Sequence, residues 1–524
     1  MYGSSKQENL AECEWLEDMQ GSIPWISFPM NRVDQVLRSP LNGTTQEEPA
    51  RLETASPDTE SSTLIRTTGT AIAGGLVSQL LKAVVIIYIA RVFGPAEFGS
   101  FSFAFSVNGF LLVLAQFGLP VFGAREVAQA GGLEKDLFKA ITQARFLLAI
   151  FGTAVALVVL HFTAGVTRGE FWLVAGFGLS NIMLSGFGDW AFQGIGRVDL
   201  WALLNIAWQG LWLVFTVAGI YARTSIVLVS FGYAAGALLA GLIGWPWLRK
   251  FMRGSHAHVT APLYSLRSVI GAGANLGTAT LLMAVLVWTD TIIVRWVQGQ
   301  HSAGVYAAGN RVSLALAMLG GYYVLGAFPK LSHSAKSSLQ EYSKYFQRAF
   351  EDLAFLFIPG ALWALFYTPQ IMLVLFHNPE YLAGATVFRI FLVLLPVSVL
   401  SNLYGMGGVV AHRRDHAYRW VYAASTATLL VLCPLLTLRW GIVGAALAAL
   451  LSHTLSLVLF MALSRDVVRP EFFKPLGLPA FMAVIPVLSG RILHLGFWVS
   501  LASLVLTYLF IVIWRRPVPH PVMK

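Results

Sequence analysis

The chain carries the stretch IARVFGPAEFGSF at residues 89–101 and a second version of it, IVRWVQGQHSAGVY, at residues 293–306. In each copy an Ile and an Arg precede a Gly, and a second Gly is followed two residues later by an aromatic residue. Both copies stand between two apolar segments, about 205 residues apart, which indicates an internal repeat. The plainer alternative is that each copy only turns a hairpin at a membrane surface.

The composition is typical of a membrane protein. Of the 524 residues 56% are hydrophobic and only 12% are charged, with a mean hydropathy of +0.67, whereas soluble domains carry about 25% charged residues. Because backbone polar groups must be satisfied inside the hydrocarbon layer, long apolar segments predict transmembrane helices. Only Cys13 and Cys433 occur, so we expect no disulfide framework and no cysteine metal site.

Fourteen apolar segments are long enough to span a bilayer. They cover residues 67–90, 100–123, 143–163, 171–193, 200–221, 226–248, 268–297, 304–328, 351–376, 383–410, 418–438, 440–463, 475–493 and 495–514. An even number of segments separates the two copies of the repeat, so the two halves should share one topology and be related by an axis along the membrane normal. The predicted fold is therefore an all-α polytopic membrane protein with two six-helix lobes in a parallel pseudo-twofold repeat, plus two extra C-terminal helices.

Lys and Arg residues fix the predicted orientation. They gather in alternate gaps between the apolar segments, for example at Arg145, Arg249 and Lys336, whereas the other gaps hold about one each. Because basic residues favour the cytoplasmic side, both termini should be cytoplasmic. The net charge of +10 is spread over these gaps, where it suits anionic membrane lipids, and we expect no nucleic-acid partner.

The predicted domain organisation has four parts. Residues 1–62 are polar and acidic and should form a disordered cytoplasmic tail. The N-terminal six-helix lobe is expected at 63–252, the C-terminal six-helix lobe at 267–464, and the two additional helices at 475–514. The gaps on the predicted outer side are short, so any function should reside inside the helix bundle.

Four stretches together resemble a known family. They are IARVFGPAEFG at 89–99, DWAFQG at 189–194, DTII at 290–293 with the glycines and aromatic residue that follow, and GIVGAA at 441–446. In this order they resemble the polysaccharide transporters of the multidrug/oligosaccharidyl-lipid/polysaccharide exporter superfamily. The resemblance implies a flippase that moves a polyprenyl-pyrophosphate-linked oligosaccharide across the cytoplasmic (inner) membrane during surface polysaccharide synthesis. Members usually begin just before the first span, so the tail departs from the family.

Polar residues within the apolar segments are candidate site residues, because an ionisable side chain at bilayer depth is costly unless it faces protein or water. Lys82 and Gln79 share one face of the first segment, Gln116 lies in the second and Asn181 in the fourth. Arg311, in the eighth segment, would face Lys82 from the opposite lobe. We predict that Lys82 and Arg311 bind the diphosphate, with Gln79, Gln116 and Asn181 also binding substrate; the small polar residues could instead serve close helix packing.

Two acidic residues are ambiguous. Asp290 could bind a coupling H⁺ or Na⁺, or it could be a structural partner of Arg311. Asp189 has the same two interpretations. Arg91 and Arg295 are expected to anchor at the outer headgroups. We expect no catalytic residue, no metal and no cofactor, since the sequence has neither a P-loop nor metal-ligand spacing.

Three functions remain open at this point. The first is a flippase that works by alternating access. The second is a cation-coupled multidrug antiporter of the same superfamily, for which twelve spans and acidic cavity residues would be expected. The third is a membrane polysaccharide polymerase or ligase, which would require a sizeable outer loop. Fourteen spans, two intramembrane cations and short outer gaps favour the first.

Overall fold

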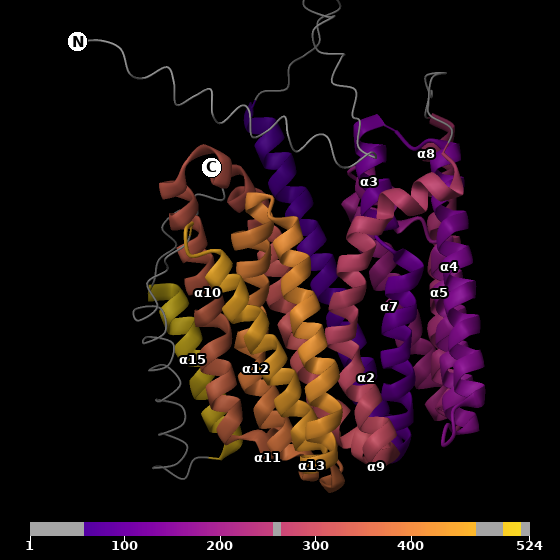
Figure 1. The fold of residues 1–524 in the computed structure, drawn as a ribbon, viewed down its shortest axis with the longest axis vertical. Coiled ribbons are helices and arrows are strands. Elements are labelled where there is room, and N and C mark those ends of the chain that lie inside the picture. The colour runs from indigo at the N-terminus through magenta and orange to yellow at the C-terminus, as the bar shows by residue number, and fades with distance from the viewer. Residues whose placement is uncertain (1–56, 131, 255–263, 468–495, 515–524) are drawn as a thin grey trace, which may run out of the picture. The chain divides into compact units, whose positions relative to one another are not determined.

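The described residues form a helical bundle. The structure is a computed structural model, and it describes residues 57–130, 132–254, 264–467 and 496–514 (Figure 1). Its helices are α2 Pro57–Gln116, α3 Leu119–Ala130, α4 Lys135–Phe162, α5 Arg168–Ser185, α6 Asp189–Gly194, α7 Val198–Tyr221, α8 Val227–Gly254, α9 Leu266–Ser337, α10 Leu339–Phe366, α11 Thr368–Phe376, α12 Ala385–Leu403, α13 Asp415–Leu463 and α15 Phe497–Trp514. Short 3₁₀ and π turns lie at Pro379–Gly384, Tyr404–Val409 and Val410–His412.

Nine of the helical segments in the described ranges are long and apolar enough to cross a membrane. Three of them, α2, α9 and α13, are bent at a glycine into two arms, so the nine correspond to the predicted spans one to twelve. The predicted polytopic all-α fold is thus confirmed. The number fourteen stays a prediction, since the expected span at 475–493 lies outside the described residues.

The repeat is visible in the backbone of α2 and α9. Gly94 bends α2 with φ 73° and ψ 176°, and Gly299 bends α9 with φ 85° and ψ 179°. Only glycine adopts this region of φ/ψ space readily, so each glycine of the repeat allows its helix to bend at the same point. We call the end of the bundle that contains these two glycines the bend end.

Two apolar clusters fill the described bundle. One contains most of the buried residues of α2 to α8, including Phe101, Phe177 and Trp212, and extends to residues of α9 to α12 such as Ala307. The other lies within α9 to α13. We therefore call α2–α8 the first half and α9–α13 the second half. The lobe boundaries predicted from the sequence stay a prediction.

Several boundaries differ from those expected. Helix α2 begins at Pro57, so residues 57–62, which were assigned to the disordered tail, are helical; residues 1–56 lie outside the described ranges. The second span was expected to reach residue 123, but Gly118, with φ 73°, separates α2 from the amphipathic helix α3. The ninth span is likewise divided at Tyr367 into α10 and α11.

Candidate functional site: a cationic cluster between the halves

Arg311 reaches from the second arm of α9 across to α2. Its Nη2 donates to the Ser102 carbonyl oxygen at 3.0 Å and to Ser106 Oγ at 2.6 Å. The guanidinium carbon lies 5.4 Å from the ring centroid of Phe105 and 5.0 Å from that of Trp288, which provides two cation–π contacts. The residue is only 6% exposed, yet Nε and Nη1 have no hydrogen-bond partner. A buried guanidinium with two nitrogen atoms that lack hydrogen-bond partners is suited to bind an anion.

Lys82 lies in the first arm of α2 and is half-buried. The positive charge of Arg311 acts on Lys82 from the other half. Gln79, one helical turn away, is hydrogen-bonded to Tyr322 of α9. Tyr322 also covers Gly75, where a Cβ atom would overlap with the tyrosine ring. The polar face that the sequence predicted on α2 therefore lies against the second half.

Asp290 lies in a buried polar cage. Its Oδ1 accepts hydrogen bonds from the Thr291 amide at 2.6 Å and from Thr291 Oγ1 at 3.2 Å. Its Oδ2 accepts from Tyr306 OH at 2.7 Å and Asn310 Nδ2 at 3.1 Å. The charge of Arg311 acts on the carboxylate, but the hydrogen bonds of the guanidinium go to α2. Arg311 therefore influences Asp290 through its charge, and whether that is its main role stays a prediction.

The other three predicted site residues lie elsewhere. Asn181 is buried and donates to Asn108 Oδ1 at 2.9 Å, within the first half. Gln116 is the last residue of α2, about ten residues and so roughly 15 Å along the helix from Ser106. Asp189 forms an ion pair with Arg145 at 3.3 Å. The contacts found for Asn181 and Asp189 therefore lie within the first half.

Two arginines have buried ion partners that the sequence did not reveal. Arg145, counted among the basic residues of a cytoplasmic gap, is inside α4, and its side chain is 3% exposed. Arg295 pairs with the fully buried Glu170, and its placement at the headgroup level stays a prediction. Charge counting along the sequence cannot reveal such pairs, because the two partners come from segments far apart in the chain.

Sequence reasoning also missed several residues that shape the cluster. They are aromatic or neutral side chains: Phe105, Trp288, Tyr306, Asn310 and Tyr322. In the sequence they look like ordinary core positions, because an aromatic residue at helical spacing usually packs in a core. The usable signal was Tyr306 and Asn310, which stand within or close to the second copy of the repeat.

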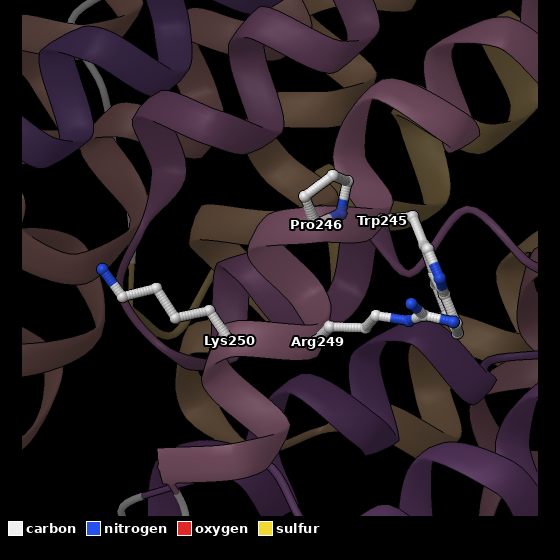
Figure 2. Close-up of a pocket in the computed structure, with 4 residues that line it drawn as sticks. All are labelled: Trp245, Pro246, Arg249 and Lys250. Atoms are coloured by element: carbon white, nitrogen blue, oxygen red, sulfur yellow. The ribbon is translucent and has the colours of Figure 1, made fainter.

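A pocket of about 370 Å³ lies on α8, lined by Trp245, Pro246, Arg249 and Lys250. Figure 2 shows Arg249 extending towards Trp245, whose ring centroid is 5.1 Å from the guanidinium carbon, and Lys250 pointing the other way. None of the predicted site residues lines this pocket. Aromatic and basic side chains together are typical of helix ends at a membrane surface.

Metal binding has no candidate within the described ranges, where no group of three or more His, Cys, Asp and Glu side chains could hold an ion. The cluster instead consists of two cations, a caged carboxylate and aromatic rings. Such a cluster can hold an anionic group, but it contains no nucleophile paired with a base.

The fold is that of a multi-pass helical membrane protein, in which the two halves contribute Lys82 and Arg311. The chain belongs to the family described as polysaccharide biosynthesis protein, which matches residues 64–335. A protein of Escherichia coli K12 named "Putative O-antigen transporter" is 22% identical over 74% of this chain and 94% of its own length. The protein of the same name from Shigella flexneri is 19% identical over 69% of this chain and 88% of its own length.

Solved structures share the fold. The lipid II flippase MurJ in an inward closed conformation superposes with a TM-score of 0.66 at 13% identity, over 85% of this chain and 98% of that one. An inward-facing multidrug resistance MATE transporter of the MOP superfamily gives 0.60 at 12% identity, over 74% and 94%. The predicted likeness to polysaccharide transporters is confirmed by the family match and by the two relatives, and the solved structures share the fold.

Proposed function

We propose that this protein is a flippase that moves polyprenyl-pyrophosphate-linked oligosaccharides across the cytoplasmic membrane by alternating access, for surface polysaccharide synthesis. Both termini would be cytoplasmic. The proposal is supported by the family, by relatives named as O-antigen transporters and by the fold shared with a lipid II flippase. Such relatives transport their substrates, so we propose no catalytic step.

The observation that carries the proposal is the half-satisfied Arg311. Inserting an arginine at bilayer depth costs roughly 2.5–3.5 kcal/mol on insertion scales, and leaving the N–H groups of two of its nitrogens unpaired adds to that cost. Lys82 brings a second positive charge from the other half, and the two cations repel each other. A diphosphate bound between them would satisfy the free N–H groups and relieve the repulsion, which explains why both cations are kept inside the bundle.

The remaining residues have proposed supporting roles. Gln79 lies beside Lys82, and Gln116 and Asn181 would contact sugars as the substrate moves along α2 and α5. Asp290 or Asp189 would bind a coupling H⁺ or Na⁺ in one state of the cycle. The cage around Asp290 consists of neutral donors, so a bound cation would have to displace at least one of them.

Loss and recovery of export tests the function. A strain that lacks the protein should lose surface polysaccharide and accumulate the lipid-linked unit, and the wild-type chain should restore export. In proteoliposomes, the purified protein should move a labelled polyprenyl-pyrophosphate oligosaccharide between leaflets, whereas the lipid without its diphosphate should stay. Equal movement of both lipids would contradict the cationic site.

A drug antiporter is the second candidate, favoured by the likeness to MATE transporters. It predicts efflux of cationic dyes and no accumulation of lipid-linked sugar in the deletion strain. The intramembrane cations Lys82 and Arg311 argue against it, because they would repel cationic drugs. A polymerase or ligase would leave single repeat units exported but unjoined.

A further inference from the structure

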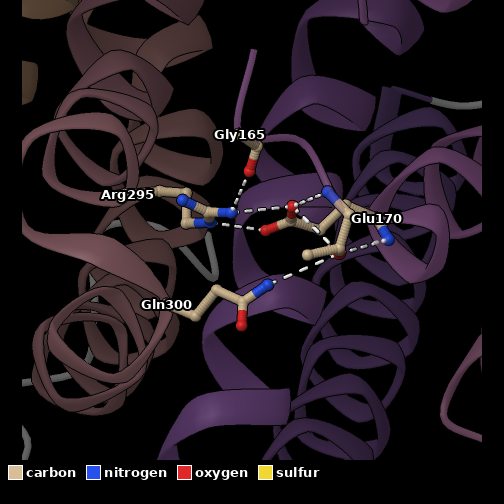
Figure 3. Close-up of polar contacts among 5 residues, drawn as sticks. Gly165, Glu170, Arg295 and Gln300 are labelled. Carbon is tan, nitrogen blue, oxygen red and sulfur yellow. Dashed lines mark hydrogen bonds and ion pairs between the residues drawn. The ribbon is translucent and has the colours of Figure 1, made fainter. Parts of the chain in front are cut away.

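Arg295 connects the two halves at the bend end through a buried ion pair. Its Nη2 donates to Glu170 Oε2 at 2.9 Å and to the Gly165 carbonyl oxygen at 3.0 Å, and its Nε donates to Glu170 Oε1. Figure 3 shows the fork of Arg295 facing the carboxylate, with Gln300 beside it donating to Thr167 Oγ1 at 3.4 Å. Glu170 is fully buried, and the Arg295 side chain is 11% exposed. A bidentate pair in such a setting is among the strongest polar contacts available.

Arg91 makes the counterpart of this contact in the other direction. From the first half it donates through Nη2 to the Val374 carbonyl oxygen at 2.6 Å, and through Nε to that of Leu375. These carbonyls lie in the last turn of α11, the negative end of its helix dipole. Each half therefore sends the arginine of its repeat to the other half at the bend end.

The second arms of α2 and α9 cross at Gly99 and Gly304. A Cβ atom on Gly99 would overlap with the Gln300 carbonyl oxygen, and one on Gly304 would overlap with that of Pro95. The second arms of α2 and α9 thus touch backbone to backbone. Together the two arginine contacts and the glycine crossing close the bend end, which is the end predicted to face outward.

We propose that the Arg295–Glu170 pair is the principal latch of the outer gate, and that Arg91 with the end of α11 is a weaker second latch. The inference rests on the proposed function only in that the halves must separate at the bend end to release the substrate. Arg295 is the stronger latch because it joins opposite charges out of water, whereas Arg91 is exposed and its partners are neutral carbonyls. Breaking the ion pair therefore favours the outward-open state.

Glu170 also stabilises the start of α5, and the experiment must separate this role from its role in the latch. It caps α5, because its side chain accepts from the Thr167 amide at 2.9 Å while Thr167 Oγ1 accepts from the Glu170 amide. Glutamine can fill the same position in a capping box. Glu170→Gln therefore removes the charge and keeps the cap. Thr167→Ala does the opposite: it removes the cap and the neutral contact with Gln300 but keeps the charges.

The reporter is a cysteine beneath the glycine crossing. Ala307 in α9 is fully buried and packs with the cluster of the first half, so Ala307→Cys becomes reactive only when the halves part. The full chain, with Cys13 and Cys433 replaced by alanine, is labelled in intact cells with a membrane-impermeant maleimide. We expect Glu170→Gln to speed labelling by at least about tenfold, the effect of losing a charged hydrogen bond. Arg295→Lys, which keeps the charge but not the fork, should lie between it and the parent.

Two controls decide between the latch and its alternatives. Thr167→Ala should label at the parental rate, and so should Asp199→Asn, which breaks the exposed Arg197–Asp199 pair at the start of α7. An unchanged rate in an inserted Glu170→Gln protein overturns the proposal, and so does equal acceleration by Thr167→Ala. Acceleration confined to inside-out vesicles would overturn the placement of the latch at the outer end. Labelling needs no substrate, so a wild-type chain that fails to restore export, together with tenfold faster labelling of Glu170→Gln, would contradict the proposed function and leave the latch standing.

Discussion

Ser106 and Arg311 occupy equivalent positions in the two repeats and are hydrogen-bonded to each other, with Ser106 Oγ 2.6 Å from Arg311 Nη2. Their offset of about 205 residues equals that between Gly99 and Gly304. The contact therefore joins two equivalent positions of the repeat, one from each half. It is not symmetric, because the second half supplies the charged donor and the first half supplies the acceptor.

Lys82 should be required for export. Replacing it with alanine or glutamate removes the cation that the first half brings to Arg311, and we expect export to be abolished while the protein still reaches the membrane. Lys82→Arg should retain part of the activity, because it keeps the charge with a different shape. The measurement is surface polysaccharide in the complemented deletion strain. Lys250→Ala, an exposed lysine on α8, is the matched control and should export normally; full export by Lys82→Ala would contradict the cationic site.

Arg311 and Asp290 should not rescue each other. Because Asp290 is satisfied by Thr291, Tyr306 and Asn310 rather than by Arg311, removing both charges should be no better than removing one. We expect Arg311→Ala to lose export, and Arg311→Ala with Asp290→Asn to stay inactive. Asp290→Asn alone places an amide donor against other donors and should cost about 1–3 kcal/mol of stability. Restored export in the double variant would return Arg311 to a purely structural role.

The glycine crossing should tolerate no side chain. Gly304→Ala forces a methyl group against the Pro95 carbonyl, so we expect it to cost about 1–3 kcal/mol as an overpacking change. Thermal unfolding of the purified protein in detergent measures this. Gly321→Ala is the matched control in the same helix arm, since nothing lies within 4 Å of its Cβ position. That substitution should be neutral or slightly stabilising, and equal losses for both glycines would contradict the crossing.

The orientation of the chain is tested by single cysteines. A cysteine near Arg223 or His301 should react with a membrane-impermeant reagent added outside, because these positions lie in gaps poor in basic residues. One near Lys336 should react only after the membrane is opened. Wild-type export by each variant shows that the topology is intact. The reverse labelling pattern would invert the predicted orientation, and with it the outward assignment of the bend end.

The sequence predicted the helical architecture well because its signals are strong and local. Long apolar segments have few stable alternatives in a bilayer, and the repeat at residues 89–101 and 293–306 marks both glycine bends. Boundaries were harder, because hydropathy does not register a change in helix direction. Gly118 and Tyr367 end helices inside segments that read as continuous spans.

The candidate site was predictable only in its charged members. Lys82 and Arg311 stand out because cations are rare in apolar segments, and their joint role in binding substrate stays a prediction. Their surroundings come from tertiary packing between α2 and α9, so Trp288 and Tyr322 gave no signal of their own. The buried ion pairs could not be predicted either, because nothing in the sequence connects Arg295 to Glu170 or Arg145 to Asp189.

The two arginine contacts at the bend end differ in which substitutions can remove them. The Arg295 contact can be lost by substitution at either Arg295 or Glu170, since both partners are side chains. The Arg91 contact uses the peptide carbonyls of Val374 and Leu375, which every amino acid carries. A genetic screen for variants in which the outer gate opens too readily should therefore return substitutions at Arg91, Arg295 and Glu170. It should return none at Val374 or Leu375.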